Sequence, residues 1–365
     1  MTHFRPAYLV AANTALLLWL LQIVACVGLR TYDHVMPALL SPPMSEAVQR
    51  NYAHMTAADR SELLATMRRL QFRYEPVIGI QQQQITSRFV NVNAHGIRSN
   101  GHAAESIASL DGSIWFLGGS TSFGYGIADS ETIPAQLERL IGQPVVNLGV
   151  PTFSTIQENL LLNHYLRIGY RPSRVLFLDG INEACNTFPY RRELSNLFDR
   201  AQRGYDWDIG GPVLMAYFRA VRKVQKLAGT WVDEGDLQSV ACATDGKQYP
   251  FAEIHARLLA ERDAICRVYD VDCRTLVQPF AGVHGRTDEL PQSFLEGDGK
   301  DVRKVFFHLE PSWRAAGAIF ITDAFDGYDR HPFIDEIHYS ADASGLIAKM
   351  IAKRLGLGGA VTPAP

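Results

Sequence analysis

Residues 114–124 read IWFLGGSTSFG, which takes the chain from an apolar run into a glycine-rich turn that carries a serine. The first four residues are apolar without alternation, as is typical of a strand buried on both faces of a sheet. A helical pattern begins near Ile133. A serine on such a turn exposes its hydroxyl beside free backbone N–H groups, so Ser120 is a candidate nucleophile. Taken alone, a Gly-Gly-Ser turn is more often just a tight connection. Its spacing fits neither of the phosphate-binding patterns Gly-x-x-x-x-Gly-Lys-Ser and Gly-x-Gly-x-x-Gly.

Three later apolar runs, at residues 145–148, 175–178 and 275–277, alternate with amphipathic helical patterns. Strands that are apolar on both faces and separated by helices predict an α/β domain, with a parallel sheet between two layers of helices. In such a domain the ligand binds at the carboxyl ends of the strands. Polar residues that directly follow the apolar runs are therefore candidates for the site.

Polar segments stand at the expected places. The run at 145–148 leads into Asn147-Leu148-Gly149, the next into Asp179-Gly180-Ile181-Asn182-Glu183, and Asp335-Glu336-Ile337-His338 lies near the end of the chain. Together with the Ser120 turn, and in this order, they resemble the conserved blocks of SGNH (GDSL-like) hydrolases of the membrane-anchored bacterial type. The resemblance spans residues 114–355.

The resemblance implies a three-layer α/β/α, flavodoxin-like SGNH domain that hydrolyses esters through an acyl-serine intermediate. Ser120 would be the nucleophile, His338 the base that takes its proton, and Asp335 the acceptor that orients the imidazole. The oxyanion hole would consist of the backbone N–H groups of Ser120 and Gly149 and the side-chain amide of Asn182. Imidazole suits the role of base because it ordinarily titrates near neutral pH.

Two residues depart from the family pattern. Gly119 stands where the Gly-Asp-Ser form has aspartate, and Glu183 replaces the aspartate that usually follows the asparagine. Neither position supplies the nucleophile, the base or an oxyanion donor, so the departures concern local geometry. Behind the Asp335–His338 segment, Ser340 is predicted to cap a helix over residues 341–355 and to hold the loop rigid.

The N-terminal segment is strongly apolar. Residues 7–29 carry no formal charge and are flanked by Arg5 and Arg30, which predicts a transmembrane helix. A cleaved secretory signal and a lipoprotein signal ending at Cys26 are the alternatives. All three export the rest of the chain. We therefore expect a single-pass protein of the bacterial inner membrane whose catalytic domain is periplasmic.

The predicted organisation is an anchor at residues 1–30, a connector at 31–105 that packs on the main domain, the hydrolase domain at 106–357 and a flexible tail at 358–365. The connector is expected to contain a helix over residues 57–72 and a strand over 88–93. An aromatic-rich insertion at about 184–249 is expected over the active-site edge. Within it, residues 212–227 form a predicted amphipathic helix.

Charge and cysteine content exclude several classes of protein. Lys and Arg total 35 against 38 for Asp and Glu, so no excess of positive charge favours nucleic acid. The five cysteines form no zinc-binding pattern, no metal site is expected, and no cofactor is implied. In an oxidising compartment Cys185, Cys242, Cys266 and Cys273 could form two disulfides of undetermined pairing; free buried thiols are the alternative.

The expected substrate is a small-molecule or glycan ester, with a short acyl group on a cell-envelope or extracellular glycan preferred by analogy with anchored relatives. Three alternatives remain open: an O-acyltransferase that uses the same triad, a lipid esterase, and a non-catalytic glycan-binding or assembly protein. Five other histidines have no partner that the sequence justifies and are interpreted as structural, namely His164, His255, His284, His308 and His331.

Overall fold

The computed structural model describes residues 44–102, 107–186, 251–285 and 298–358, together with scattered positions between 10 and 24. The chain divides into two compact units. One comprises Met1–Met44 and Gln202–Asp236, of which few residues are described, and the other comprises Ser45–Ala201 and Leu237–Pro365. The second unit contains every strand named below.

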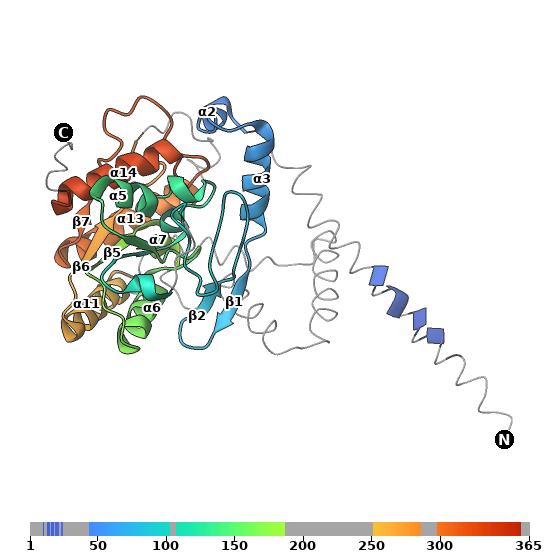
Figure 1. Ribbon diagram of the computed structural model, residues 1–365, viewed down its shortest axis with the longest axis horizontal. Coiled ribbons are helices and arrows are strands. Elements are labelled where there is room, and N and C mark those ends of the chain that lie inside the picture. Colours follow the sequence, from blue (N-terminus) through green and yellow to red (C-terminus); the bar gives the residue numbers. More distant parts are fainter. Residues whose placement is uncertain are drawn as a thin grey trace, which may run out of the picture. The chain divides into compact units, whose positions relative to one another are not determined.

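A five-stranded parallel sheet forms the centre of the second unit (Figure 1). Its order is β4 (Val145–Asn147), β3 (Ile114–Gly118), β5 (Arg174–Asp179), β6 (Cys273–Val277) and β7 (Ile319–Phe320), and every neighbouring pair is parallel. This is the flavodoxin-like order, in which the second strand of the sheet lies outside the first. The predicted parallel sheet is confirmed, and β7 is a strand that the sequence analysis did not identify.

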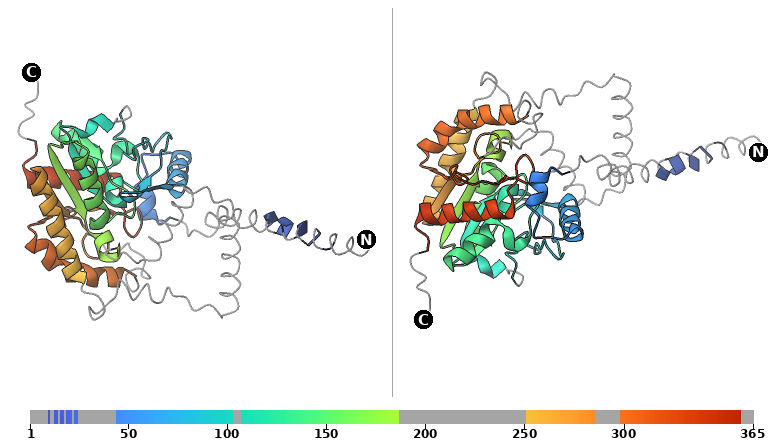
Figure 2. Two further views of the ribbon diagram at one scale, coloured as in Figure 1. Left: turned by 90° about the horizontal axis from the view of Figure 1, so that it is seen from below. Right: turned by 90° about the horizontal axis from the view of Figure 1, so that it is seen from above.

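Helices cover both faces of the sheet (Figures 1 and 2). On one face, α5 (Ile133–Ile141) and α14 (Ala341–Leu355) pack against a core that includes Ile114, Phe116 and Leu176. On the other face, α6 (Thr155–Arg167) and α11 (Phe251–Tyr269) pack against the alternate side chains of the same strands. α13 (Asp298–Ala315) lies beside α11. Successive side chains of a strand point to opposite faces, which explains why both layers are apolar.

The residues before the sheet belong to the same compact unit. They form α2 (Glu46–Arg50), α3 (Ala57–Arg68) and an antiparallel hairpin of β1 (Phe72–Glu75) and β2 (Gly79–Gln82). Short elements at other sites complete the described structure: η1 (Ile107–Leu110), α4 (Ser120–Phe123), η2 (Asp129–Glu131) and α7 (Ile181–Asn186). α3 ends at Arg68, earlier than the predicted residue 72: the Arg69 N–H binds Thr66 O at 3.0 Å in a tighter last turn, and β1 then begins at Phe72.

The predicted strand over residues 88–93 is wrong. This stretch takes part only in isolated bridges, Ile85 with Val92 and Val92 with Arg98. Its backbone groups bind scattered partners: the Val90 N–H donates to Ser87 Oγ at 2.9 Å and the Asn91 N–H to Asp129 Oδ1 at 3.1 Å, whereas Val92 exchanges backbone hydrogen bonds with Ile85. A strand needs one neighbouring strand along its length, and these bonds go to separate loop positions and side chains.

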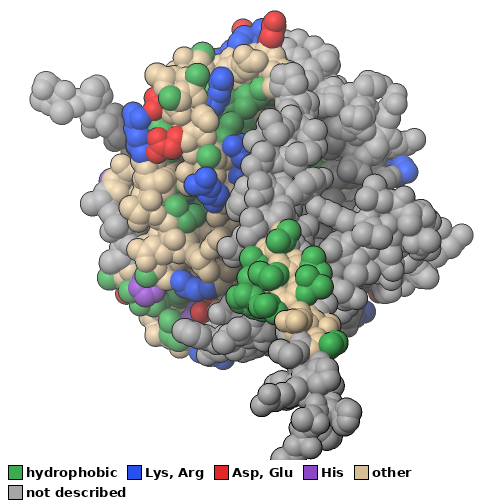
Figure 3. Space-filling model, turned by 90° about the vertical axis from the view of Figure 1, so that its right-hand side faces the viewer, with side chains coloured by type: hydrophobic (Ala, Val, Ile, Leu, Met, Phe, Trp, Pro, Cys, Tyr) green, Lys and Arg blue, Asp and Glu red, His purple; other side chains and the backbone are tan. Residues whose placement is uncertain are grey.

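The described positions between residues 10 and 24 are helical, and their apolar side chains are exposed, for example Leu16 at 54% and Trp19 at 58% (Figure 3). None of the helices in the described part of the chain is both long and apolar enough to cross a membrane. Most of the predicted anchor lies outside the described residues. So do residues 187–250 of the predicted insertion, with its helix at 212–227, and the tail from residue 359.

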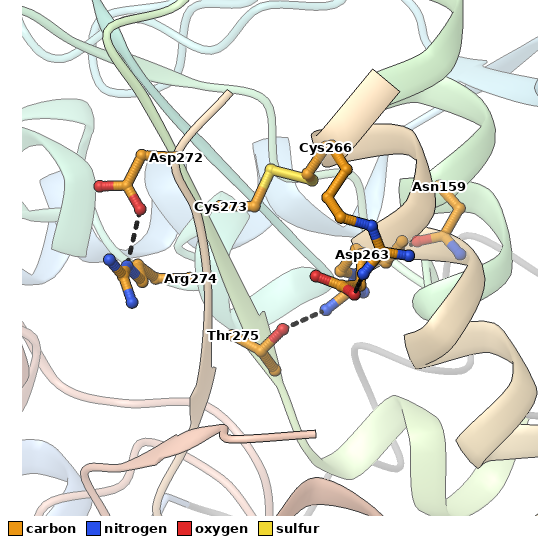
Figure 4. The surroundings of a disulfide bond; sticks show 9 residues. Asn159, Asp263, Cys266, Asp272, Cys273, Arg274 and Thr275 are labelled. Atoms are coloured by element: carbon orange, nitrogen blue, oxygen red, sulfur yellow. Dashed lines mark hydrogen bonds and ion pairs between the residues drawn. A yellow bond between two sulfur atoms is a disulfide. The ribbon is translucent and has the colours of Figure 1, made fainter. Parts of the chain in front are cut away.

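One disulfide joins the end of α11 to the start of β6, between Cys266 and Cys273 (Figure 4). The bond closes a short loop, with a sequence separation of 7. Beside it, Asp272 accepts a hydrogen bond from Arg174 Nε at 2.6 Å and forms an ion pair with Arg274, whose Nε lies 2.7 Å from Asp272 Oδ1. The sequence left the pairing of these cysteines open, and the structure joins these two.

Candidate active site

Ser120 is the first residue of α4, directly after β3 and Gly119. The turn is tight: Gly118 has a φ of 149°, and a Cβ there would lie 2.0 Å from Ser122 Oγ. α4 has 4 residues and ends at Gly124, whose N–H and that of Tyr125 both bind Ser120 O at 2.9 Å. The turn places the half-buried Ser120 at the carboxyl end of a central strand, where a parallel sheet binds its ligand.

The loop that precedes α14 carries Asp335 and His338. It is closed by a hydrogen bond from the Ile334 N–H to His338 O at 2.8 Å. Asp335 Oδ1 accepts the N–H groups of Ile337 at 2.8 Å and His338 at 2.7 Å, so one carboxylate oxygen organises the loop. Ser340 caps α14 by accepting the Ala343 N–H at 3.2 Å, as predicted.

The structure brings the three predicted triad residues together. His338 Nε2 lies 2.8 Å from Ser120 Oγ, and His338 Nδ1 lies 2.7 Å from Asp335 Oδ2. The imidazole is 14% exposed and the carboxylate 35% exposed, so a substrate could reach the site while water is partly excluded. With Nδ1–H donated to Asp335, Nε2 is left as the acceptor for the Ser120 hydroxyl.

The charge of Asp335 is stabilised in place. Burial raises the pKa of its carboxyl, but the charge of His338 and the hydrogen bonds from His338 and Ile337 outweigh burial and hold that pKa below its ordinary value.

The Tyr125 ring packs against the imidazole, with its centre 4.7 Å from that of the His338 ring and a tilt of 32° between the two planes. This contact restricts how the imidazole can turn. Tyr125 was not among the predicted site residues, although its position five residues after Ser120 placed it near the nucleophile.

The predicted oxyanion donors differ in what they bind. The Ser120 N–H meets no acceptor within the described ranges. Asn182 Nδ2 donates one hydrogen to Phe153 O at 2.6 Å, which leaves its second hydrogen for a ligand. The Gly149 N–H donates to Asn147 Oδ1 at 3.0 Å. A ligand would have to displace that side chain, so Gly149 is the predicted donor that this conformation does not leave available.

Gly119 explains how Asn182 approaches the nucleophile turn. A Cβ at position 119 would lie 1.9 Å from Asn182 Nδ2, so the amide occupies space that any other residue would fill. Gly149 makes a similar approach to α4, because a Cβ there would lie 2.4 Å from Phe123 N. The departure of residue 119 from the family pattern is thus matched to the placement of the neighbouring amide.

Arg98 holds the chain in place after the C-terminal end of α4. This fully buried guanidinium donates to Gly124 O at 2.6 Å and to Ile127 O at 2.7 Å, and it lies over the Phe123 ring at 4.5 Å. Its charge is paired with Asp129, with Nε 3.1 Å from Oδ1. Buried charges are tolerated when paired and fully hydrogen-bonded, and here the pairing fixes the chain around the nucleophile.

A second network of buried charges lies next to the turn that carries Asn182. Arg262 on α11 binds Asp179 Oδ1 at 2.9 Å and Glu158 Oε2 at 2.7 Å, and all three side chains are at most 3% exposed. Glu183 accepts the N–H groups of Thr155, at 3.0 Å, and Gly180. It thereby ties the turn that carries Asn182 to the start of α6.

The three acids of this network, Glu158, Asp179 and Glu183, come close enough together to bind a cation. In this structure the Arg262 guanidinium lies among them and supplies positive charge. Burial and the charge of Asp179 raise the pKa of Glu158 well above its ordinary value and that of Glu183 to about 8. Neutral carboxyls reduce the excess of negative charge without a metal. The sequence analysis noted Glu183 only as a departure from the family pattern.

No protein-family model matches the chain, and no curated protein matches it. Among solved structures it is similar to Est24, a carbohydrate acetylesterase from Sinorhizobium meliloti, with 14% identity, 67% of this chain and 99% of that chain covered, and a TM-score of 0.34. It is also similar to a variant of Axe2, an acetyl xylan esterase from Geobacillus stearothermophilus, with 14% identity, 69% of this chain and 100% of that chain covered, and a TM-score of 0.35. A third similar structure is a member of the lipolytic protein G-D-S-L family from Veillonella parvula, with 11% identity, 66% of this chain and 96% of that chain covered, and a TM-score of 0.36. At these values the similarities carry no argument about activity, which has to rest on the site itself.

Proposed function

We propose that the protein is a serine ester hydrolase of the SGNH type. The observation that supports it is the continuous chain of hydrogen bonds from Asp335 through His338 to Ser120. His338 Nε2 takes the hydroxyl proton as Ser120 Oγ attacks the ester carbonyl carbon. The imidazolium that forms is stabilised by Asp335, whose pKa is held low.

The negative charge that develops on the carbonyl oxygen is stabilised by hydrogen bonds from the Ser120 N–H and from the second amide hydrogen of Asn182. Collapse of the tetrahedral intermediate breaks the bond to the alcohol, which leaves with the proton from His338. Water then attacks the acyl-Ser120 ester, again giving its proton to His338, and the acid is released as Ser120 regains its hydrogen. One oxyanion donor can contribute about 100- to 1000-fold to turnover.

The proposed substrate is a short acyl ester, such as an acetyl group on a cell-envelope or extracellular glycan. In this proposal residues 1–30 anchor the enzyme in the bacterial inner membrane and the catalytic domain is periplasmic. The uncharged run at residues 7–29 supports an anchor or export signal. The disulfide between Cys266 and Cys273 supports an oxidising compartment, where such bonds persist.

The test compares p-nitrophenyl acetate, butyrate and octanoate as substrates of the full chain in detergent, with Ser120→Ala as the decisive variant. The exposed Ser130→Ala is the matched control. We expect hydrolysis that falls with acyl length, survives in Ser130→Ala and drops by about 1000-fold or more in Ser120→Ala. A folded Ser120→Ala protein as active as wild type would refute the proposal. Product release that requires an added sugar would indicate transfer, and a preference for octanoate would indicate a lipid ester.

A further inference from the structure

Two consecutive residues before the sheet each bind a different catalytic loop. Asn51 and Tyr52 follow α2, and both are buried, at 9% and 3% exposure. The Tyr52 hydroxyl donates to Gly126 O at 2.9 Å, in the loop after the nucleophile helix. Asn51 Nδ2 donates to Phe333 O at 2.8 Å, at the start of the loop that carries Asp335 and His338.

Each bond lies close to a catalytic group. The residue before Gly126 is Tyr125, whose N–H binds Ser120 O at 2.9 Å and whose ring packs against His338. On the other side, Phe333 is followed by Ile334, whose N–H binds His338 O. A shift of either carbonyl would therefore pass to Ser120 or to His338 through one further residue.

The two loops also meet each other at this place. Gly126 has a φ of 84°, and a Cβ there would lie 2.1 Å from Ile334 Cδ1. The Ile334 side chain thus fills the space above the glycine, while Asn51 and Tyr52 bind the chain on either side of the contact. The loops contact each other directly and are joined again through these two neighbouring side chains.

Neither side chain is needed to end α2. The helix has 5 residues, and its C-terminal carbonyls are bound by the backbone N–H of Asn51. The amide and the phenol instead bind partners 282 and 74 positions away. Burying such polar groups is costly unless they are paired, so their partners fix where α2 sits. Burial and the charge of Asp335 raise the pKa of Tyr52 further above neutral pH, so its hydroxyl is protonated and can donate.

We propose that Asn51 and Tyr52 are positioning residues that together set the distance between Ser120 Oγ and His338 Nε2. This inference rests on the proposed function, because it assigns them to the proton transfer between those atoms. The described segment that precedes the sheet then helps to position the catalytic groups. The two bonds act in series, so loss of either one removes this second connection and leaves the direct contact between Gly126 and Ile334.

The test measures kcat and KM of the full chain with p-nitrophenyl acetate for Tyr52→Phe, Asn51→Ala and the double variant. Tyr269→Phe is the matched control, because it also removes one phenol hydrogen bond, to Asn163 Oδ1 on α6. We expect kcat to fall by about 10- to 100-fold in each single variant, with KM changed by less than about twofold. Because the bonds act in series, the double variant should lose little more than either single one.

Hydrogen–deuterium exchange gives a readout that needs no activity. Tyr52→Phe should speed amide exchange in residues 120–127 and in residues 333–338, and exchange in the strands of the sheet should not change. Kinetics and exchange that match those of Tyr269→Phe would overturn the proposal, as would a uniform loss of protection, which indicates a merely structural role. Should Tyr52→Phe fail to fold, Asn51→Ala carries the same test. A wild type with no esterase activity would refute the proposed function, and the exchange data alone would then decide whether the two residues couple the loops.

Discussion

His338 Nε2 lies 2.8 Å from Ser120 Oγ, although 218 positions of sequence separate the two residues. The serine is fixed by the end of β3 and the histidine by the loop before α14. Because α14 packs beside α5 on the same face of the sheet, the two segments meet at one edge of the fold. The reactive distance therefore depends on packing between elements from both ends of the domain.

Replacing Asp335 by asparagine should abolish most of the activity while preserving the fold. The carboxylate accepts hydrogens from His338 Nδ1 and from two backbone N–H groups, whereas an amide can accept on only one atom. The imidazole would then be held in the wrong tautomer, and kcat should fall by about 10,000-fold, as it does in serine proteases. Asp323→Asn, at an exposed ion pair with Arg354, is the control. Retention of a tenth of wild-type kcat would exclude the assigned role.

Asp335 should also make stability depend on pH in the acid range. Its pKa in the folded protein lies below the ordinary value of about 3.9, mainly because of His338. A lowered pKa contributes stability that is present above the unfolded pKa and is lost as pH falls through the folded pKa. Urea denaturation between about pH 6 and pH 2.5 should show wild type losing more free energy of unfolding than Asp335→Asn. Parallel curves for the two proteins would contradict this assignment.

Much of the fold could be predicted from local pattern. A strand buried on both faces needs a continuous apolar run, which is why residues 114–117, 145–148 and 175–178 identify β3, β4 and β5. Ser340 was found because a capping hydroxyl must precede the helix it caps. The triad residues were found because their order along the chain resembles a known family, and the structure places them within hydrogen-bonding distance.

The rest depends on contacts that the local pattern does not encode. β7 has only 2 residues, too few to show a periodicity. Asn51 binds Phe333 across 282 positions, and nothing near Asn51 in the sequence indicates that partner. The alternating residues 88–93 look like a strand, but their backbone bonds go partly to side chains and otherwise to separate loop positions instead of one neighbouring strand. Arg262 and Glu158 lie on helices where charge usually indicates a solvated face, so their burial was missed.

The network around Arg262 predicts a second pH dependence, of opposite sign. Burial and the charge of Asp179 raise the pKa of Glu158 in the folded protein. A raised pKa contributes stability that is full below the ordinary value of about 4.3 and is lost as pH rises through the folded pKa. Denaturation between about pH 5 and pH 9 should therefore show a decline that Glu158→Gln, a mimic of the neutral acid, makes shallower. Equal slopes in wild type and Glu158→Gln would show that Glu158 is ionised throughout.

Arg262→Met should lower the free energy of unfolding by about 3 kcal/mol or more at pH 7, because it leaves the acids without a cation.

Gly149→Ala should impair catalysis through the nucleophile helix. An added Cβ would lie 2.4 Å from Phe123 N and 2.8 Å from Ser122 C, and both are backbone atoms of α4. Since backbone cannot rotate away as a side chain can, α4 must move, and Ser120 moves with it. We expect kcat to fall by about 100-fold, with a destabilisation of about 2 kcal/mol. Gly317→Ala is the control: a Cβ there meets nothing within 4 Å, but its φ of 71° should cost about 1 kcal/mol without loss of activity. Activity in Gly149→Ala equal to that of Gly317→Ala would mean that α4 can shift without displacing Ser120 from His338.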